Sequence, residues 1–194
     1  MRHDSCYAGV DDGFFRKGWR RSLAVLAVHC RVGSHLCPCG LFHSWFTVDG
    51  LDATSVIVEL GSRALESFEL RLLLLDTPVF AGFNVAEPWR VSEELGVPVA
   101  VVYLYPPRRG RVERALRLHF PDWRRRLEVL ERVWAGLREA PCPRGSLLLA
   151  SYGVGWEEAW RLVCGLQVYT RVPEPLYTAH TVASGLARSL LHGR

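Results

Sequence analysis

The sequence predicts a single α/β domain with a mixed sheet, in which an antiparallel three-strand meander is followed by parallel strands, with helices on both faces. Two observations predict this class. Residues 7–48 hold three strand-like apolar segments with short connections, and the rest of the chain alternates helical spacing with unbroken apolar runs. A third observation concerns domain number. No repeat or linker divides the 194 residues, of which 49% are hydrophobic and 23% charged. A chain of this length can bury roughly 70% of its unfolded surface, which is enough for one core.

The N-terminal segments predict the meander. Residues 7–10 are a short apolar run that ends in an Asp-Asp-Gly sequence, and residues 22–32 are long, apolar and rich in Val and Ala. After a turn expected at residues 33–40, residues 41–48 alternate roughly between apolar and polar side chains. Strand patterns with short, Gly-containing connections are typical of antiparallel neighbours.

The pattern then changes to helical spacing at Val56, Leu60 and Leu65, with Asp52 or Thr54 suited to the N-cap. The unbroken apolar runs that follow are typical of strands buried on both faces. A meander followed by strand–helix–strand units is the element order of the ribonuclease H-like fold, and we expect one such domain over residues 1–194. The remaining elements are expected as strands at 70–75, 97–105 and 146–150 and helices at 87–95, 112–118, 123–137, 156–166 and 175–191.

Composition places the chain away from membranes. The longest apolar runs, residues 72–75 and 97–104, are far short of the roughly 20 residues that a spanning helix needs. Residues 1–20 contain three Asp and lack the apolar stretch of a signal peptide. We therefore expect a cytoplasmic protein that does not contact a membrane. The sequence does not predict its oligomeric state.

Six cysteines occur without CxxC spacing. In an ordinary cytosol they would be reduced, although hyperthermophile cytosols are an exception, so a disulfide stays possible with no pairing predicted. A zinc site is one interpretation of Cys30, His35, Cys37 and Cys39. The alternative, which we favour, is a hairpin tip that carries thiols.

The acidic residues are the strongest functional signal. Five of the seven Asp sit at or just past the predicted end of a strand, although each alone has an ordinary explanation as a turn or cap residue. The cap interpretation is favoured for Asp52. Binding sites in open α/β sheets form at the carboxyl ends of parallel strands, so we expect a shared site there. The five are Asp11, Asp12, Asp49, Asp52 and Asp76.

A cluster of carboxylates needs a counter-charge. Unit charges about 4 Å apart interact by roughly 4 kcal/mol at an effective dielectric constant of 20. Hard carboxylate oxygens select Mg²⁺ or Mn²⁺, which can activate water and stabilise a leaving oxygen in phosphodiester hydrolysis. The placement therefore predicts a divalent-metal site at Asp11, Asp49 and Asp76, with Asp12 and Asp52 beside it.

Two segments suggest contacts to nucleic acid. Residues 108–126 hold eight Arg against Glu113 and Asp122, an excess that could meet phosphates, or could be a solvated face of two helices. Residues 80–84, shortly after Asp76, combine small residues with two Phe, of which one could stack on a base while the other packs in the core. The predicted contacts are Gly82, Phe83, Asn84, Arg108, Arg109 and Arg111.

Four motifs resemble a known family. They are A-G-V-D-D-G-F at 8–14, V-D-G-L-D-A-T at 48–54, L-D-T-P-V-F-A-G-F-N at 75–84 and E-P-L-Y-T-A-H-T-V-A-S-G at 174–185. They look like those of a mainly archaeal family, classed as a domain of unknown function, that itself resembles endonuclease V. The resemblance covers nearly the whole chain. Endonuclease V cleaves nucleic acid near deaminated bases with a metal held by Asp, Glu and Asp, which the resemblance carries onto Asp11, Asp49 and Asp76.

The chain also departs from that pattern. Asp49 is one methylene shorter than Glu. Thr77 stands where Gly is usual, and its side chain would hinder the close approach of the backbone to a nucleic-acid strand. Residues 151–154 replace a Ser-Pro-Gly-His run and contain no His. His180 is the alternative histidine, either a catalytic proton donor or metal ligand or a buried structural residue. The base-reading wedge of endonuclease V is not recognisable, so inosine specificity is not implied.

Three functions follow from these observations. The first is a metal-dependent nuclease or phosphodiesterase that acts on DNA or RNA. The alternative is a nucleic-acid-binding or regulatory protein that retains the fold without the chemistry, which the missing His and Thr77 favour. A third is an acidic site that acts on a small phosphorylated molecule.

Overall fold

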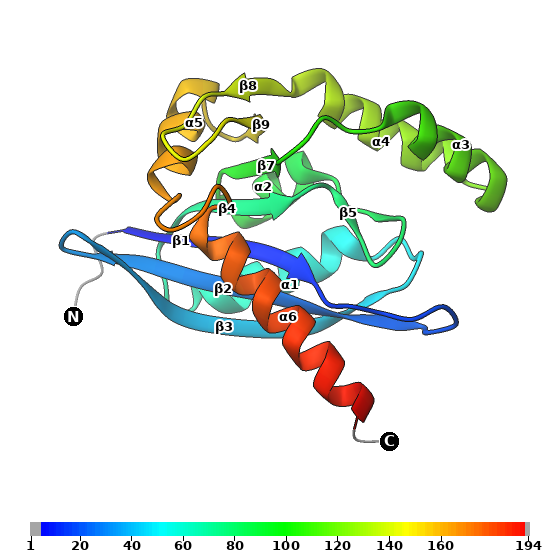
Figure 1. The fold of residues 1–194 in the computed structure, drawn as a ribbon, viewed down its shortest axis with the longest axis horizontal. Helices are drawn as coiled ribbons and strands as arrows, with labels where there is room; N and C mark the ends of the chain where they lie inside the picture. The colour runs from blue at the N-terminus through cyan, green and yellow to red at the C-terminus, as the bar shows by residue number, and fades with distance from the viewer. Residues whose placement is uncertain (1–4, 193–194) are drawn as a thin grey trace.

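A computed structural model describes residues 5–192 and contains a seven-stranded mixed sheet in the order β3-β2-β1-β4-β7-β9-β8 (Figure 1). A separate ribbon of two short strands pairs Val79–Phe80 with Asn84–Val85. Both ribbon strands and β8 are too short to show a period in the sequence and were not predicted. The sheet strands are β1 (Ser5–Asp12), β2 (Arg21–Val32), β3 (His35–Thr47), β4 (Leu70–Asp76), β7 (Val99–Tyr103), β8 (Arg138–Ala140) and β9 (Leu147–Tyr152), and the ribbon strands are β5 and β6.

The strand directions confirm the predicted fold class. β1, β2 and β3 form the antiparallel meander, and β1, β4 and β7 run parallel to one another. β9 differs from the predicted series because it runs antiparallel to β7. The connection between them contains two helices and β8, and β9 begins at the same end of the sheet where β7 ends.

Helices cover both faces of the sheet (Figure 1). α6 crosses β1 and β2 on one face, with α5 nearby, whereas α1, α2 and α4 pack on the other. Among residues 5–192, none of the helices combines the length and apolar character that a membrane crossing requires. The helices are α1 (Ala53–Leu65), α2 (Pro88–Leu95), α3 (Arg109–His119), α4 (Trp123–Gly136), α5 (Trp156–Gly165) and α6 (Glu174–His192).

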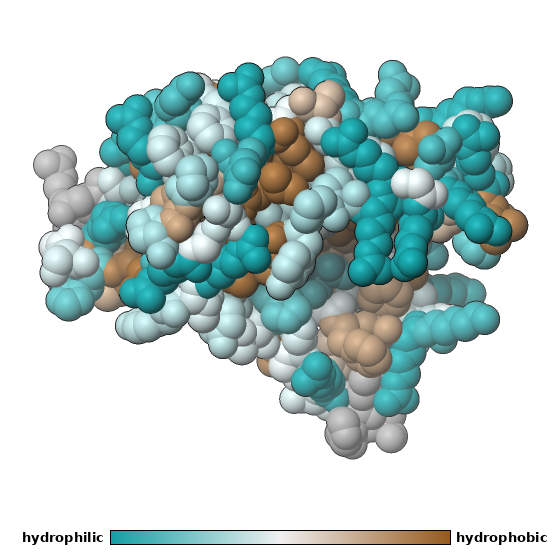
Figure 2. Space-filling model, turned by 45° about the horizontal axis from the view of Figure 1, so that its top comes forward, coloured by the Kyte–Doolittle hydropathy of each residue, from teal (hydrophilic) through white to brown (hydrophobic). Residues whose placement is uncertain are grey.

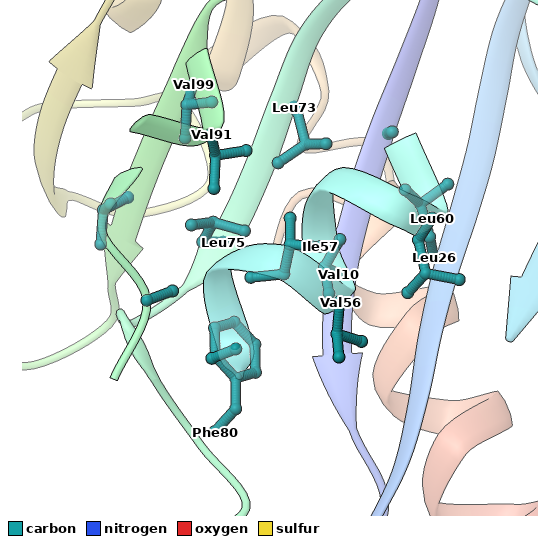
Figure 3. Packing of buried hydrophobic residues seen from close by; sticks show 14 of the residues in the cluster. Val10, Leu26, Val56, Ile57, Leu60, Leu73, Leu75, Phe80, Val91 and Val99 are labelled. Atoms are coloured by element: carbon teal, nitrogen blue, oxygen red, sulfur yellow. The ribbon is translucent and has the colours of Figure 1, made fainter. Parts of the chain in front are cut away.

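Two cores result from the alternation of side chains along the strands. Leu73 and Leu75 point to the face of α1 and α2, where they pack with Ile57 and Val91 (Figure 3). Leu72 and Leu74 point to the opposite face, towards α5 and the start of α6. The unbroken Leu run of β4 therefore serves two cores, as expected for a strand that is buried on both sides.

Glycines in the first motif let α6 lie directly on β1. A Cβ atom on Gly9 would come within 2.5 Å of the Leu176 nitrogen and the Pro175 carbonyl carbon. A Cβ atom on Gly13 would come within 2.7 Å of the Ala183 carbonyl oxygen. The two glycines thus set the distance between the strand that carries the acidic motif and the C-terminal helix.

The second hairpin is tighter than expected. Its turn is only Gly33-Ser34, and β3 begins at His35 instead of residue 41. A register shift next to Pro38 leaves an extra residue in β3, a bulge that accommodates a proline within a strand.

Four of the six cysteines form disulfides. Cys6 and Cys30 are directly opposite each other on β1 and β2, and Cys142 bonds to Cys164. Cys37 and Cys39 are free thiols. Cys30 is therefore not available as a zinc ligand, and no cluster of three or more potential metal ligands occurs within the part of the chain that the structure describes.

Candidate active site

Two aspartates end neighbouring parallel strands. Asp11 lies near the end of β1 and Asp76 ends β4, one residue beyond the paired Val10 and Leu75. Because side chains alternate along a strand, both carboxylates lie on the face of the sheet that α6 covers. Asp11 is only 7% exposed. The fold thus places these two carboxylates side by side, as the sequence predicted.

His180 reaches this pair from α6. Its Nδ1 atom lies 2.7 Å from Asp11 Oδ2, and 64% of its side chain is exposed. The close packing of α6 at Gly9 and Gly13 brings the histidine to the end of β1. Of the two interpretations left open by the sequence, a buried structural histidine is wrong, because the ring is open to solvent on one side and held by a buried carboxylate on the other.

The electrostatics of the site follow from burial and like charge. Burial, together with the neighbouring charges of Asp76 and Asp12, raises the pKa of Asp11 to about 7, although the hydrogen bonds to the Asp12 N–H and to His180 oppose the rise. Burial also raises the pKa of Asp76, with Asp12 adding to the effect and His180 opposing it. A shared proton or a cation would relieve this repulsion.

Asp12 faces the other side of β1. Its Oδ2 accepts a hydrogen bond of 2.9 Å from the Ala81 N–H and one of 3.4 Å from the Ser22 hydroxyl. Burial raises its pKa, and the bonds from Ala81 and Ser22 oppose the rise. Asp12 therefore ties the loop after β4 to the acidic site while adding its charge to that of Asp11 and Asp76.

Asp49 is placed beside the site, in contact with the loop that follows β4. It has a φ of 57°, and its exposed carboxylate accepts the Phe83 N–H at 2.9 Å. A Cβ atom on Gly82 would lie 2.3 Å from Asp49 Oδ1. The close approach predicted at Gly82 is thus made to the Asp49 side chain, and Asp49 is not among the charges that shift Asp11 or Asp76.

Asp52 and Asn84 form an internal network. The Asp52 carboxylate accepts from the Thr47 hydroxyl at 2.6 Å and from the Asn84 amide, and makes no side-chain bond to the helix it precedes. Asn84 is fully buried, and its Oδ1 atom accepts the Ala53 N–H at 2.9 Å, so it is the residue that caps α1. The predictions that Asp52 binds metal and that Asn84 contacts nucleic acid do not fit this network.

Arg126 is a site residue that sequence reasoning missed. It is 5% exposed, pairs with Asp122, and donates to the carbonyl oxygens of Gly50 at 2.8 Å and Asp49 at 3.0 Å and to that of Phe83 at 2.5 Å. From α4 it therefore holds both loops that border the acidic pair. The available signal was Asp122 four residues earlier, followed by buried leucines at helical spacing.

Tyr103 also escaped notice, at the end of β7. Burial and, to a smaller extent, the charge of Asp76 raise its pKa to about 12, although its oxygen accepts the Trp134 indole N–H at 3.2 Å, which opposes the rise. It lies one residue beyond Val102, the partner of Asp76 in the sheet. The only available signal was its position at the end of a parallel strand.

Some of the residues predicted to contact nucleic acid make contacts within the protein, and others have exposed side chains. Arg108 and Arg111 have exposed side chains, whereas Arg109 donates to the Trp134 carbonyl at 3.1 Å and lies over that ring. Phe83 packs edge-to-face on Phe120. Phe80 is the core ring of the pair expected at 80–83, because it is buried and stacked on Phe46.

The structure shows where two departures from the family pattern, Thr77 and residues 151–154, lie relative to the acidic pair. Thr77 has a φ of 70°, a region in which glycine is far less strained than a β-branched residue. Residues 151–154 follow the paired Tyr152 and Val99, whereas Asp76 pairs with Val102. Because β9 runs antiparallel, those residues lie at the opposite edge of the sheet, and a missing histidine there takes nothing from the acidic pair.

The acidic pair has the donor chemistry of a divalent-cation site. Asp11 and Asp76 are hard oxygen donors whose mutual repulsion a cation would relieve, and Mg²⁺ commonly takes one or two carboxylates together with water and phosphate oxygens. The residues therefore fit such an ion, with Asp11 and Asp76 as its holders. Asp49 and Asp52 are engaged elsewhere, so the set is smaller than predicted.

The comparisons with known proteins identify the family. Residues 4–187 match the family model described as endonuclease dU. The chain belongs to the endonuclease dU family. A UPF0215 protein of Pyrococcus furiosus is 33% identical over 181 residues, 93% of this chain and 91% of the relative. The predicted membership of an archaeal family akin to endonuclease V is thereby confirmed.

Solved structures support the same assignment of fold. An Archaeoglobus fulgidus protein of unknown function has a TM-score of 0.80 at 25% identity, over 94% of this chain and 98% of its own. The endonuclease V of Ciona intestinalis, solved with DNA containing an inosine, has a TM-score of 0.63 at 11% identity, over 96% and 87%. This chain of the endonuclease dU family therefore shares the ribonuclease H-like fold of endonuclease V.

Proposed function

We propose that this chain is a divalent-metal-dependent nuclease that cleaves a phosphodiester bond next to a deaminated nucleoside such as deoxyuridine. The observation that carries the proposal is the Asp11–Asp76 pair at the end of two parallel strands, with His180 bonded to Asp11 at 2.7 Å. Membership of the endonuclease dU family and the fold shared with endonuclease V support it. The proposed ion, Mg²⁺ or Mn²⁺, would be held by Asp11 and Asp76 and would supply charge stabilisation at the phosphate.

The protein's own groups have separate tasks in this proposal. Asp11 holds the His180 ring, leaving its outer edge to exchange a proton with the substrate, the arrangement of a base with its orienting carboxylate. Asp12 and Arg126 position the loops at residues 81–83 and 49–50 around the pair. These tasks require no contact with the base.

The test combines metal binding with cleavage. Mn²⁺ binding is measured by calorimetry for wild type, Asp76→Asn and Glu66→Gln, which removes an exposed carboxylate at the end of α1. The same proteins are incubated with oligonucleotides that contain deoxyuridine, inosine or only ordinary bases. We expect Asp76→Asn to lose both activities and Glu66→Gln to keep both. Cleavage by Asp76→Asn at the wild-type rate would refute the proposed site, and binding of oligonucleotide without turnover by wild type would favour a non-catalytic binding protein.

A further inference from the structure

The β1–β2 hairpin, residues 13–21, is a concentrated basic segment outside the arginine-rich helices. It contains Arg16, Lys17, Arg20 and Arg21 and no acidic residue, so it carries as much positive charge as the net +4 of the whole chain. All four side chains are exposed, and within residues 5–192 none of them forms an ion pair. Exposed, unpaired cations close together attract a polyanion.

The base of this hairpin is joined to the acidic site. The Gly13 N–H donates to the Leu23 carbonyl at 2.8 Å, and the Ser22 hydroxyl donates to Gly13 at 2.8 Å and contacts Asp12 at 3.4 Å. Arg16 is four residues beyond Asp12, at most about 14 Å away along an extended chain. The cations therefore stand within a few phosphate spacings of the carboxylates.

The tip has local support of its own. Phe14 and Trp19 meet edge-to-face with ring centroids 6.5 Å apart, and the Trp19 N–H donates to the Arg16 carbonyl at 3.0 Å. On the other side of the base, the Arg20 carbonyl accepts the Val48 N–H at 3.0 Å. These contacts present the basic side chains on a formed turn, which reduces the entropy cost of binding.

The arginine-rich helices are more fully engaged within the protein. Arg117 pairs with Glu113 at 2.7 Å and lies over Trp123, and Arg124 lies over the same ring. The hairpin and α3 occupy opposite sides of the end towards which β1 points (Figure 1), and Figure 2 shows hydrophilic side chains projecting at that end. A strand that passes the acidic pair would thus meet cations on both sides.

We propose that the β1–β2 hairpin is a second nucleic-acid-binding element, which holds the phosphate backbone of the strand that leads away from the acidic site. This inference rests on the proposed nuclease function and adds the surface that fixes the path of the substrate. The contact is to phosphates, so it carries no sequence preference.

The test is the salt dependence of binding, measured without cleavage. A fluorescein-labelled single-stranded DNA that contains deoxyuridine is titrated in EDTA with wild type, R16S/K17S and the matched control R71S/R161S. Arg71 is exposed at the start of β4, at the opposite end of the sheet, and Arg161 is exposed on α5. Loss of two phosphate contacts should reduce the slope of log affinity against log salt by about 1.4 in R16S/K17S and leave it unchanged in the control.

The outcomes separate this inference from the proposed function. An unchanged slope in R16S/K17S, or an equal loss in the control, would overturn the role of the hairpin even if wild type cleaves. The expected loss in R16S/K17S would support that role even if no cleavage is found, in which case only the nuclease proposal fails. If wild type does not bind the oligonucleotide at all, both fail.

Discussion

Substitution of Gly9 by alanine is expected to displace α6 from β1. The added Cβ would lie 2.5 Å from the Leu176 nitrogen and the Pro175 carbonyl carbon, about 1 Å short of the ordinary contact of 3.4–4 Å. Both neighbours are backbone atoms, so no flexible side chain can move aside. Overpacking typically costs 1–3 kcal/mol, and we expect the upper end, about 3 kcal/mol of unfolding free energy.

The same displacement should reach the chemistry. A helix shift of about 1 Å would break the 2.7 Å bond between His180 and Asp11, and a misplacement of that size can lower a rate by about 10². Urea unfolding in EDTA gives the stability, and the cleavage assay gives the rate. Any activity loss beyond the unfolded fraction would report the displaced histidine.

Gly185→Ala is the matched control for Gly9→Ala. Gly185 lies in α6 itself, and a Cβ atom there would meet nothing within 4 Å. Alanine should therefore stabilise the helix by about 0.5–1 kcal/mol. If Gly9→Ala unfolds within about 0.5 kcal/mol of wild type, the argument that two glycines set the distance to α6 is wrong.

Three further predictions concern buried charge. Asp11→Asn should abolish cleavage yet stabilise the metal-free protein at pH 8 by up to about 4 kcal/mol. Because the pKa of Asp11 is raised from 3.8 to about 7, the native carboxyl keeps a proton that the unfolded one has lost, so the stability of wild type falls as pH rises through that window. Urea unfolding at pH 4 and pH 8 checks this, and an equal effect of the substitution at both pH values would contradict it. His29 is 4% exposed, and burial lowers its pKa from 6.5 to about 4, so between these values the unfolded state binds a proton that the native state does not. On going from pH 7 to pH 4, wild type should therefore lose up to about 3 kcal/mol of unfolding free energy relative to His29→Gln. Parallel profiles of unfolding free energy against pH for the two proteins would exclude this cause. Arg126→Gln should lower the unfolding free energy by about 3 kcal/mol and speed amide exchange at Phe83. The control Arg125→Gln, at an exposed position, should stay within about 0.5 kcal/mol of wild type. Similar unfolding free energies for the two variants would refute the positioning role of Arg126.

Local patterns were sufficient where a segment repeats one physical environment. The apolar run of β4 was predicted to within a residue because a strand buried on both faces needs an apolar side chain at nearly every position. The helix expected at 87–95 ends where Gly96 follows it, and Gly96 has a φ of 64° in the structure, a conformation that glycine adopts without strain. The turn of the second hairpin was placed too broadly, because residues 35–40 include Pro38 and Gly40, residue types that are uncommon in strands, and only pairing with β2 keeps them extended.

Within the site, the sequence alone determined which residues could be acidic donors and that Asp11 and Asp76 end parallel strands. Only the tertiary structure decided which of the five aspartates meet. Asp49 and Asp52 also follow a strand, but their carboxylates accept hydrogen bonds from other segments. Asp49 accepts from the Phe83 N–H, and Asp52 accepts from Thr47 and Asn84. The role of His180 was likewise decided by α6 docking at Gly9. Strand position is a local property that the residues themselves encode, whereas the partner of a carboxylate depends on contacts between segments that are apart in the sequence, by 34 residues for Asp49 and Phe83 and by 169 for Asp11 and His180.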